Sequence, residues 1–242
     1  MMGDDRISSL PSRYSNPFAT CWTRPGALPF QFAAGESAEQ LVARFAAVGG
    51  RGEIVGPHGS GKSTLLEALK PQLAAAGWSV AAVTLRDGER RLPRGFLRQA
   101  LAAPRPLVIV DGYEQLSHVN RIALRLRCRL SAAALLVTSH ASAGWPLIYR
   151  THPTRELAEQ LVSSLTARNS SPISLRDIAA SHASCGSNLR AMLFALYERH
   201  EALVAARRNA LRAAAAAAPK RARPRRACEV RIWRERCALR QQ

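Results

Sequence analysis

Lysine is scarce in this 242-residue sequence. Only three of its 35 basic residues are lysines, at positions 62, 70 and 220, and the others are arginines. The chain therefore uses arginine where any positive charge is sufficient. Lysine differs because it carries a compact point charge on a flexible stem. Lys62 stands inside a motif that needs this property, as described below.

Aromatic residues and paired cysteines are also scarce. Phe, Trp and Tyr make up 6% of the chain, so we expect a core built mostly of leucine, valine and alanine. The five cysteines are scattered, and none belongs to a C-x-x-C pair or has a histidine at zinc-finger spacing, which argues against a structural zinc site. An odd number of scattered cysteines suits a reducing compartment, so we expect a cytoplasmic protein.

Long hydrophobic segments are missing from the sequence. No apolar run approaches the ~20 residues needed to cross a bilayer, so we expect no membrane span. The N-terminal residues Met1 to Asp5 lack the basic and then apolar pattern of a signal peptide, and we expect none.

Acidic residues are too few to balance the arginines. With 17 acidic residues the net charge is +18, which indicates an anionic partner such as nucleic acid or a membrane surface. A compositional bias of the coding sequence explains the charge equally well. Residues 220–242 carry nine basic residues against Glu229 and Glu235. We expect this tail to be disordered when free and to bind nucleic acid non-specifically, or else to be a solubilising appendage.

The most specific motif lies at residues 56–63, which read Gly-Pro-His-Gly-Ser-Gly-Lys-Ser and match the P-loop pattern G-x-x-x-x-G-K-[ST]. A short strand, residues 51–55, precedes it and a leucine-rich helix follows it, so backbone N–H groups and a helix N-terminus can hold phosphates. Lys62 then reaches the outer phosphates, and the Ser63 hydroxyl can bind Mg²⁺. The expected nucleotide-binding residues are Gly56, Pro57, His58, Gly59, Ser60, Gly61, Lys62, Ser63 and Thr64.

Strands and helices alternate around this motif, which predicts an α/β fold with a five-stranded parallel sheet. The expected strands are 51–55, 78–85, 107–111, 133–138 and 147–151, and the expected helices between and before them are 35–48, 62–76, 95–103 and 116–130. Only helices follow, at 154–168, from 174, and at 188–218. We therefore divide the chain into an extended arm (1–35), a P-loop NTPase domain (36–151), a helical lid (152–205) and an Ala-rich helix with the basic tail (206–242).

Carboxylates follow the most apolar strand of the chain. Asp111 ends the strand Leu107 to Val110, and the carboxyl end of a strand is where open α/β sheets bind ligands. We expect Asp111, together with Ser63, to hold Mg²⁺. Glu114 is the best available group to orient a water molecule for hydrolysis. A surface or helix-capping role for Glu114 remains equally consistent with the sequence.

Hydroxyl side chains follow the next strand. Thr138 and Ser139 would lie at the end of a strand placed between the strands that end at Val55 and at Asp111, near the γ-phosphate. Either hydroxyl could instead serve as a simple cap of the strand end.

These elements together resemble the AAA+ ATPases, and the likeness covers about residues 16–204. Gly186 to Arg190 resembles the sensor 2 segment of that family, which implies that Arg190 reaches the γ-phosphate from the lid, although it is also one arginine among many. The arm with Asn16, Pro17 and Phe18 resembles the N-terminal segment of the origin-recognition, secretion and transposition branches, which packs near the adenine. The resemblance implies ATP and Mg²⁺ as cofactors and leaves a homo-oligomer open.

The chain departs from the family pattern directly after Asp111. The family usually has glutamate there, but this chain has Gly112, so we expect slow hydrolysis at most, and no arginine finger can be assigned. The leading hypothesis is an ATP-binding protein that couples Mg-ATP to movement of the lid. Two alternatives stay open: a small-molecule kinase, with the Arg-rich segment 86–91 in its lid, and a scaffold that binds ATP without hydrolysing it.

Overall fold

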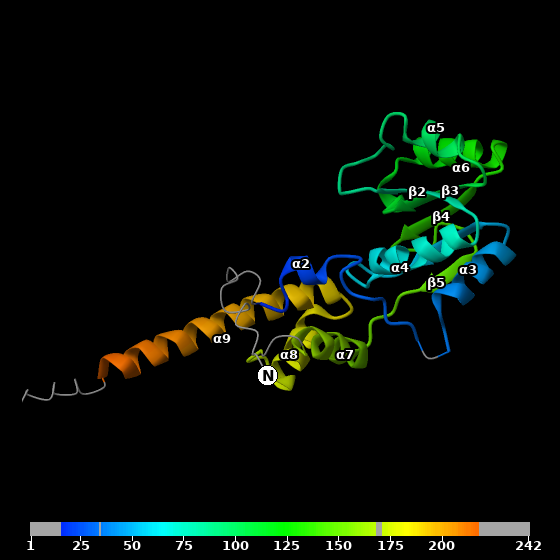
Figure 1. The fold of residues 1–242 in the computed structure, drawn as a ribbon. Coiled ribbons are helices and arrows are strands. Elements are labelled where there is room, and N and C mark those ends of the chain that lie inside the picture. The colour runs from blue at the N-terminus through cyan, green and yellow to red at the C-terminus, as the bar shows by residue number, and fades with distance from the viewer. Residues whose placement is uncertain (1–15, 34, 168–170, 218–242) are drawn as a thin grey trace, which may run out of the picture. The chain divides into compact units, whose positions relative to one another are not determined.

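The computed structural model describes residues 16–33, 35–167 and 171–217 (Figure 1). Five strands form one sheet in which every neighbouring pair is parallel, in the order β2-β3-β4-β1-β5. Their bounds are β1 Arg51–Val55, β2 Ser79–Thr84, β3 Pro106–Asp111, β4 Ala134–Ser139 and β5 Leu147–Arg150. The predicted fold class, a five-stranded parallel α/β sheet followed by helices, is confirmed.

Strand β3 shows why the sheet needs a helical layer on each face. Successive side chains of a strand point to opposite faces. Leu107 and Ile109 pack on one side, in a cluster with Leu41 and Phe45 of α3 and the leucines of α4. Val108 and Val110 pack on the other side, with α5 and α6. All four of these side chains are fully buried, as in parallel sheets covered on both faces.

Four main helices cover the sheet (Figure 1). They are α3 Ala38–Ala47, α4 Lys62–Ala75, α5 Phe96–Leu101 and α6 His118–Leu130. Two short elements are α2 Thr20–Thr23 and the 3-10 helix η2 Tyr113–Gln115, and Tyr113 of η2 packs in the cluster with α5 and α6. Ser37 and Ser117 cap α3 and α6 by accepting hydrogen bonds from the N–H groups of Gln40 and Asn120. The sequence predicted this helix from Leu116 to Leu130; α6 begins two residues later, at His118, and η2 lies between β3 and α6.

Three helices follow the sheet: α7 Arg155–Thr166, α8 Leu175–Cys185 and α9 Leu189–Ala217. Thr154 caps α7, and Ser174 forms the predicted capping box with Asp177 at the start of α8. Their apolar faces form a third core cluster of their own, which includes Phe18 from the N-terminal arm. The helical segment after the sheet therefore has its own core.

The chain divides into two compact units, residues 1–202 and 203–242. The described part of the second unit, residues 203–217, is the C-terminal portion of α9. The predicted basic tail, 220–242, lies outside the described residues, as do residues 1–15 of the predicted arm. Among the helices that the structure describes, none has the length and apolar character needed to span a membrane.

Candidate nucleotide-binding site

The P-loop connects β1 to α4 at the carboxyl end of the sheet. Val55 is the last residue of β1 and Lys62 is the first of α4. Gly59 and Gly61 have φ values of +67° and +96°, which glycine adopts without strain. Gly61 stands at the N-cap and contributes no side-chain cap, so the first N–H groups of α4 stay available to a ligand. The local sequence thus produces the anion-binding loop that the motif predicts.

Lys62 is folded back onto this loop. Its ammonium Nζ donates to the carbonyl oxygens of Gly56 and Pro57, at 2.6 and 2.8 Å. Burial lowers the pKa of Lys62, and the nearby Arg190 lowers it further, whereas Glu114 and Asp111 act in the opposite direction. Two carboxylates and a second cation therefore lie near the ammonium, at the point where phosphates are expected.

A chain of short hydrogen bonds joins three elements beside Lys62. The Ser63 hydroxyl, at the start of α4, donates to Asp111 Oδ2 at 2.6 Å. The Thr138 hydroxyl of β4 donates to the other oxygen, Oδ1, also at 2.6 Å. Thr138 Oγ1 in turn accepts from the N–H of Gly112 at 2.9 Å. The two expected metal-binding residues, Ser63 and Asp111, are thus brought together, with Thr138 beside them.

Ser139 does not join this network. Its side chain is buried, and its hydroxyl donates to the carbonyl of Ala141 at 2.7 Å, within the turn that follows β4. Thr64, on the first turn of α4, is half-buried, and no side-chain contact connects it to Asp111. Of the two hydroxyls at the end of β4, only Thr138 contacts the carboxylate that the sequence assigns to Mg²⁺.

Glu114 lies in η2 and pairs with a histidine. Its Oε1 is 3.1 Å from His140 Nδ1, and its Oε2 is buried without a hydrogen-bond partner. The His140 ring is tilted by 45° against the ring of His58 from the P-loop, with centroids 3.5 Å apart. Burial lowers the pKa of His140, as do Lys62 and His58, while Glu114 opposes this. Glu114 is therefore held at the P-loop rather than on a helix surface.

Gly112 occupies a position that has no room for a side chain. Its φ is +85°, and a Cβ placed on it would lie 2.7 Å from the backbone oxygen of Leu85. A glutamate at this position would require both left-handed strain and a shift of the β2 strand end. The backbone conformation at Gly112 therefore disfavours the glutamate that the AAA+ pattern has at this position. Glu114 is the next carboxylate in the segment between β3 and α6.

The lid approaches the P-loop at Gly59. A Cβ on Gly59 would overlap Asn188 Oδ1 and would lie 3.2 Å from Arg190 Cβ. Asn188 Oδ1 also accepts from the N–H of Ala191, so this side chain caps the start of α9. Arg190 is exposed, yet close enough to Lys62 to lower its pKa. The structure therefore places the predicted sensor residue next to the phosphate loop.

Sequence reasoning missed Thr151 as part of the loop. Its hydroxyl oxygen is 2.6 Å from Ser60 Oγ, and both side chains are buried. A Cβ on Gly56 would overlap the same hydroxyl, which explains why glycine is needed there. The only available signal was a polar residue at the end of the expected fifth strand.

The N-terminal arm packs on the lid. Asn16 is buried, and its amide donates to the carbonyl of Tyr197 and to Glu201 Oε1, while Phe18 packs in the lid core. Further along the arm, the ring of Phe30 lies 3.6 Å from the position of a Cβ on Gly61. The arm therefore contacts both the lid and the P-loop.

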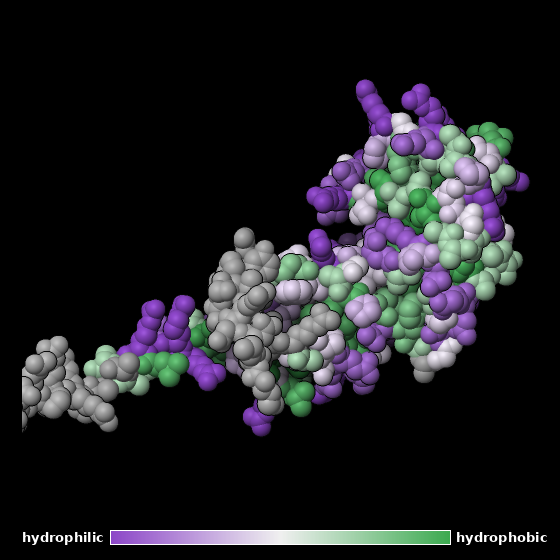
Figure 2. Space-filling view, in the orientation of Figure 1, coloured by the Kyte–Doolittle hydropathy of each residue, from purple (hydrophilic) through white to green (hydrophobic). Residues whose placement is uncertain are grey.

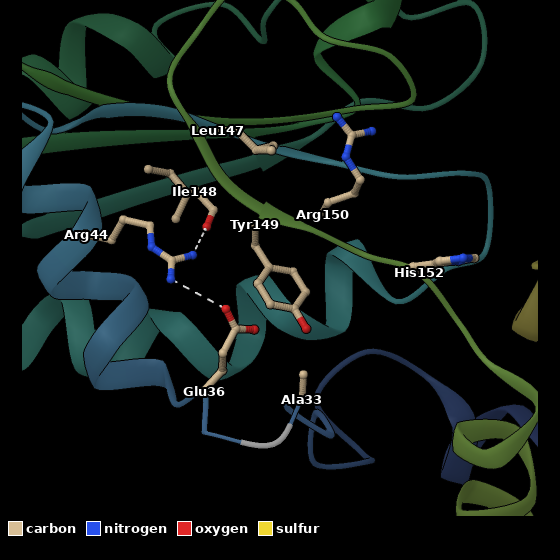
Figure 3. Close-up of a pocket in the computed structure, with 8 residues that line it drawn as sticks. All are labelled: Ala33, Glu36, Arg44, Leu147, Ile148, Tyr149, Arg150 and His152. Carbon is tan, nitrogen blue, oxygen red and sulfur yellow. Dashed lines mark hydrogen bonds and ion pairs between the residues drawn. The ribbon is translucent and has the colours of Figure 1, made fainter.

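A separate cavity of about 370 Å³ opens beside the edge strand β5 (Figure 3). Arg44 donates to the carbonyl of Ile148 at 2.8 Å and pairs with Glu36. Tyr149 points into the same space, and burial, followed by the nearby Glu36, raises its pKa. No P-loop residue lines this cavity. Arg44 belongs to α3, so this helix supplies a hydrogen-bond donor to a backbone carbonyl of the edge strand β5.

The sequence matches no protein-family description, and no curated protein matches it. Among solved structures it is similar to replication initiator DnaA bound to AMPPCP and single-stranded DNA, with 13% identity over 69% of this chain and a TM-score of 0.47. It is also similar to AMPPCP-bound DnaA from Aquifex aeolicus, with 14% identity, 66% of this chain and 61% of that chain covered, and a TM-score of 0.46. A third similar structure is PCH-2 from C. elegans, with 14% identity, 67% of this chain and 66% of that chain covered, and a TM-score of 0.40.

The chain spans 61% of the length of the first of these structures. All three TM-scores lie below 0.5, so the fold of this chain is described from its own parallel sheet and P-loop.

Proposed function

We propose that this chain is an Mg-ATP-binding protein of AAA+ type, in which bound ATP draws the lid against the P-loop. The observation that carries the proposal is the convergence of Lys62, Ser63 and Asp111 at the start of α4. At a helix N-terminus, an ammonium binds the phosphates of a nucleoside triphosphate, and a hydroxyl and a carboxylate bind its metal ion.

Phosphate binding uses groups that the loop already orients. The N–H groups of the first turn of α4, together with the positive end of the helix dipole, favour an anion at this point. Lys62 exchanges its two carbonyl partners, Gly56 and Pro57, for phosphate oxygens. This exchange replaces neutral acceptors by charged ones, which strengthens the hydrogen bonds. ATP binding is therefore coupled to the release of the loop carbonyls.

The donor set beside Lys62 fits magnesium. Mg²⁺ prefers oxygen ligands and keeps several waters, so one hydroxyl and one carboxylate are sufficient on the protein side. The Ser63 hydroxyl and the Asp111 carboxylate, 2.6 Å apart, would hold it. When bound, the ion neutralises charge on the phosphate oxygens. Thr138 fixes the Asp111 carboxylate through its second oxygen.

The lid supplies the discrimination between ATP and ADP. Arg190 stands beside Gly59 and close to Lys62, where the outermost phosphate of ATP is expected. A guanidinium that contacts only this phosphate stabilises the closed lid with ATP and not with ADP. In this proposal the lid therefore closes when the γ-phosphate is present and opens when it is absent.

Hydrolysis is slow in this proposal, because Glu114, the carboxylate proposed to orient water, also pairs with His140 and no glutamate follows Asp111. Gly112 cannot carry a side chain, and Glu114 is paired with His140 at 3.1 Å. The same two observations favour a second candidate function, a scaffold that binds ATP and does not hydrolyse it.

Turnover measurements separate these functions. Purified protein is incubated with Mg-ATP alone, with single-stranded DNA, and with a panel of small hydroxyl and carboxyl acceptors. ADP and inorganic phosphate at a low rate support the ATPase, and ATP binding without any product supports the scaffold. A phosphorylated acceptor without free phosphate shows a small-molecule kinase and overturns the AAA+ proposal.

The basic tail adds non-specific binding of nucleic acid to this proposal. Nine basic residues within 220–242 can neutralise phosphates, with Kd on the order of 10⁻⁶–10⁻⁴ M at physiological salt. A truncation that removes residues 219–242 is expected to lose DNA binding and its salt dependence while it keeps ATP binding. Equal DNA affinity of both forms would exclude the tail as the contact.

A further inference from the structure

Helix α6 is apolar on its outer face as well as on its inner one. Leu124 and Cys128 are 1% exposed and pack against the sheet. On the opposite side, Val119, Ile122, Leu126 and Leu130 are 76%, 65%, 54% and 78% exposed. Figure 2 shows hydrophobic residues at the surface of the part of the molecule that holds α5 and α6. A helix that covers a sheet ordinarily has a polar outer face.

The four exposed side chains form a narrow seam. At 100° per residue they fall within about 80° of one another around the helix, and they span about 16 Å along it. Their spacing of three, four and four residues is that of a helix-packing seam, in which one or two apolar residues per turn meet a second helix. We call these four residues the α6 seam.

Positive charge surrounds the α6 seam. Arg127 and Arg129 flank it on its two sides, both are exposed, and neither has an ion pair or side-chain hydrogen bond within the described residues. Near the N-terminal end of the helix, the carbonyl of Arg90 accepts a hydrogen bond from the Asn120 amide, which brings the basic segment Arg90–Arg91 alongside. Residues 118–130 contain no acidic residue.

These features favour one occupant over two others. Pairing of two α6 seams from copies of this chain would place arginine against arginine, which like-charge repulsion disfavours. Helices that lie on membranes have a broad apolar face rich in Trp, Phe and Leu, whereas the α6 seam is narrow and holds no aromatic residue. An acidic helix with its own apolar seam would bury the apolar side chains of the α6 seam and would place carboxylates next to the flanking arginines.

We propose that the α6 seam is a docking surface for an amphipathic helix of an acidic partner protein. The partner helix buries the seam and places carboxylates opposite Arg127 and Arg129. This surface is independent of the nucleotide site, because none of its residues belongs to the P-loop or to the network of Asp111.

The test uses the full chain and a designed peptide as the probe. The peptide has about three heptads, with leucine at a and d and glutamate at e and g, and a fluorescent label. A second peptide keeps the glutamates and replaces the leucines by serine. Fluorescence anisotropy at physiological salt gives the affinity for the wild-type protein and for two variants, Leu126→Ser in the seam and Leu175→Ser, which changes an exposed leucine of α8 outside the seam. Circular dichroism confirms that both variants are folded.

The expected result is micromolar binding of the leucine peptide, weakened about tenfold by Leu126→Ser and unchanged by Leu175→Ser. The double change Arg127→Ser and Arg129→Ser weakens it as well, while Arg207→Ser and Arg208→Ser do not. The proposal is overturned by absence of binding, by equal affinity of the serine peptide, or by equal effects of the two leucine variants. Binding to phosphatidylserine vesicles, or a dimer in sedimentation, that is lost with Leu126→Ser would equally overturn it.

Discussion

The Ser63 hydroxyl donates a hydrogen bond of 2.6 Å to Asp111 Oδ2, which ties the first turn of the P-loop helix to the carboxyl end of β3. The other oxygen of the same carboxylate accepts from Thr138. Asp111 is 9% exposed, so its two bonds are made largely away from water. A single carboxylate therefore links α4, β3 and β4 at the place where the nucleotide is proposed to bind.

Asp111→Asn tests whether this carboxylate supports the metal. The amide keeps the shape and one acceptor oxygen, so the fold should persist, but the charge that attracts Mg²⁺ is lost. We expect the gain in ATP affinity on adding Mg²⁺ to fall by about tenfold or more, as measured by calorimetry with and without the ion. Asp177→Asn in the α8 capping box is the control, because it removes a hydrogen-bonded carboxylate of the lid that the sequence does not assign to the metal. Unchanged Mg²⁺ dependence in Asp111→Asn would refute the assignment.

Glu114→Gln tests the water-orienting role. The change keeps the size of the side chain and the pairing atom for His140 but removes the charge. ATP affinity should stay within about twofold, while the turnover rate falls by about tenfold or more, because general-base and orienting groups contribute 10²–10⁴-fold. A single-turnover assay measures the rate. If turnover is retained in full, Glu114 is only a packing partner of His140.

Gly59→Ala tests the contact between lid and P-loop. The new Cβ would overlap the Asn188 side chain, so this side chain must give up its cap on Ala191 or the lid must move away from the loop. Left-handed strain alone costs about 1–2 kcal/mol. Gly88→Ala isolates this cost, since Gly88 has φ +88° and nothing within 4 Å of the added Cβ. We expect both variants to lower thermal stability, but only Gly59→Ala to weaken the preference for ATP over ADP. The same nucleotide preference in both variants would mean that lid contact at Gly59 is irrelevant to binding.

His200 makes the stability of the lid depend on pH. It is buried beside Phe18, its Nδ1 has no hydrogen-bond partner, and burial lowers its pKa below the ordinary 6.5, with Glu201 opposing. The unfolded chain therefore binds the proton more readily, so its contribution to stability is full above pH 6.5 and is lost as the pH falls below it. The melting temperature should drop less between pH 7 and pH 5 in His200→Leu than in the wild type. The pKa of His140 is lowered too, so part of the drop should remain. Identical slopes would contradict this account.

Local sequence patterns were sufficient to predict the strands and the helix that form the proposed phosphate site. The apolar run that ends at Asp111 and the glycine-rich loop before Lys62 each specify a strand end and a helix start, and parallel pairing then brings the two together. The contacts of Lys62 with the loop carbonyls follow from the same short segment.

Contacts between distant segments could not be read from the sequence. Thr151 lies 91 residues from Ser60, and only the pairing of β5 with β1 brings their hydroxyls to 2.6 Å. Ser139 and Thr138 are adjacent in the sequence and look equivalent, but alternation along β4 turns one toward Asp111 and leaves the other to the local turn. The sequence alone did not reveal the α6 seam, because the buried face and the outer face of helix α6 both carry apolar residues.

ATP binding by Lys62→Ala is the measurement that tests the central claim most directly. Calorimetry with Mg-ATP compares this variant with Lys70→Ala, which removes a lysine from the same helix where it pairs with Glu67 at the surface. Because Lys62 is proposed to supply the charge that meets the outer phosphates, we expect Lys62→Ala to weaken ATP binding at least a hundredfold, with the fold intact by circular dichroism. Lys70→Ala should bind as the wild type does. Equal ATP affinity in the wild type and Lys62→Ala would contradict the account.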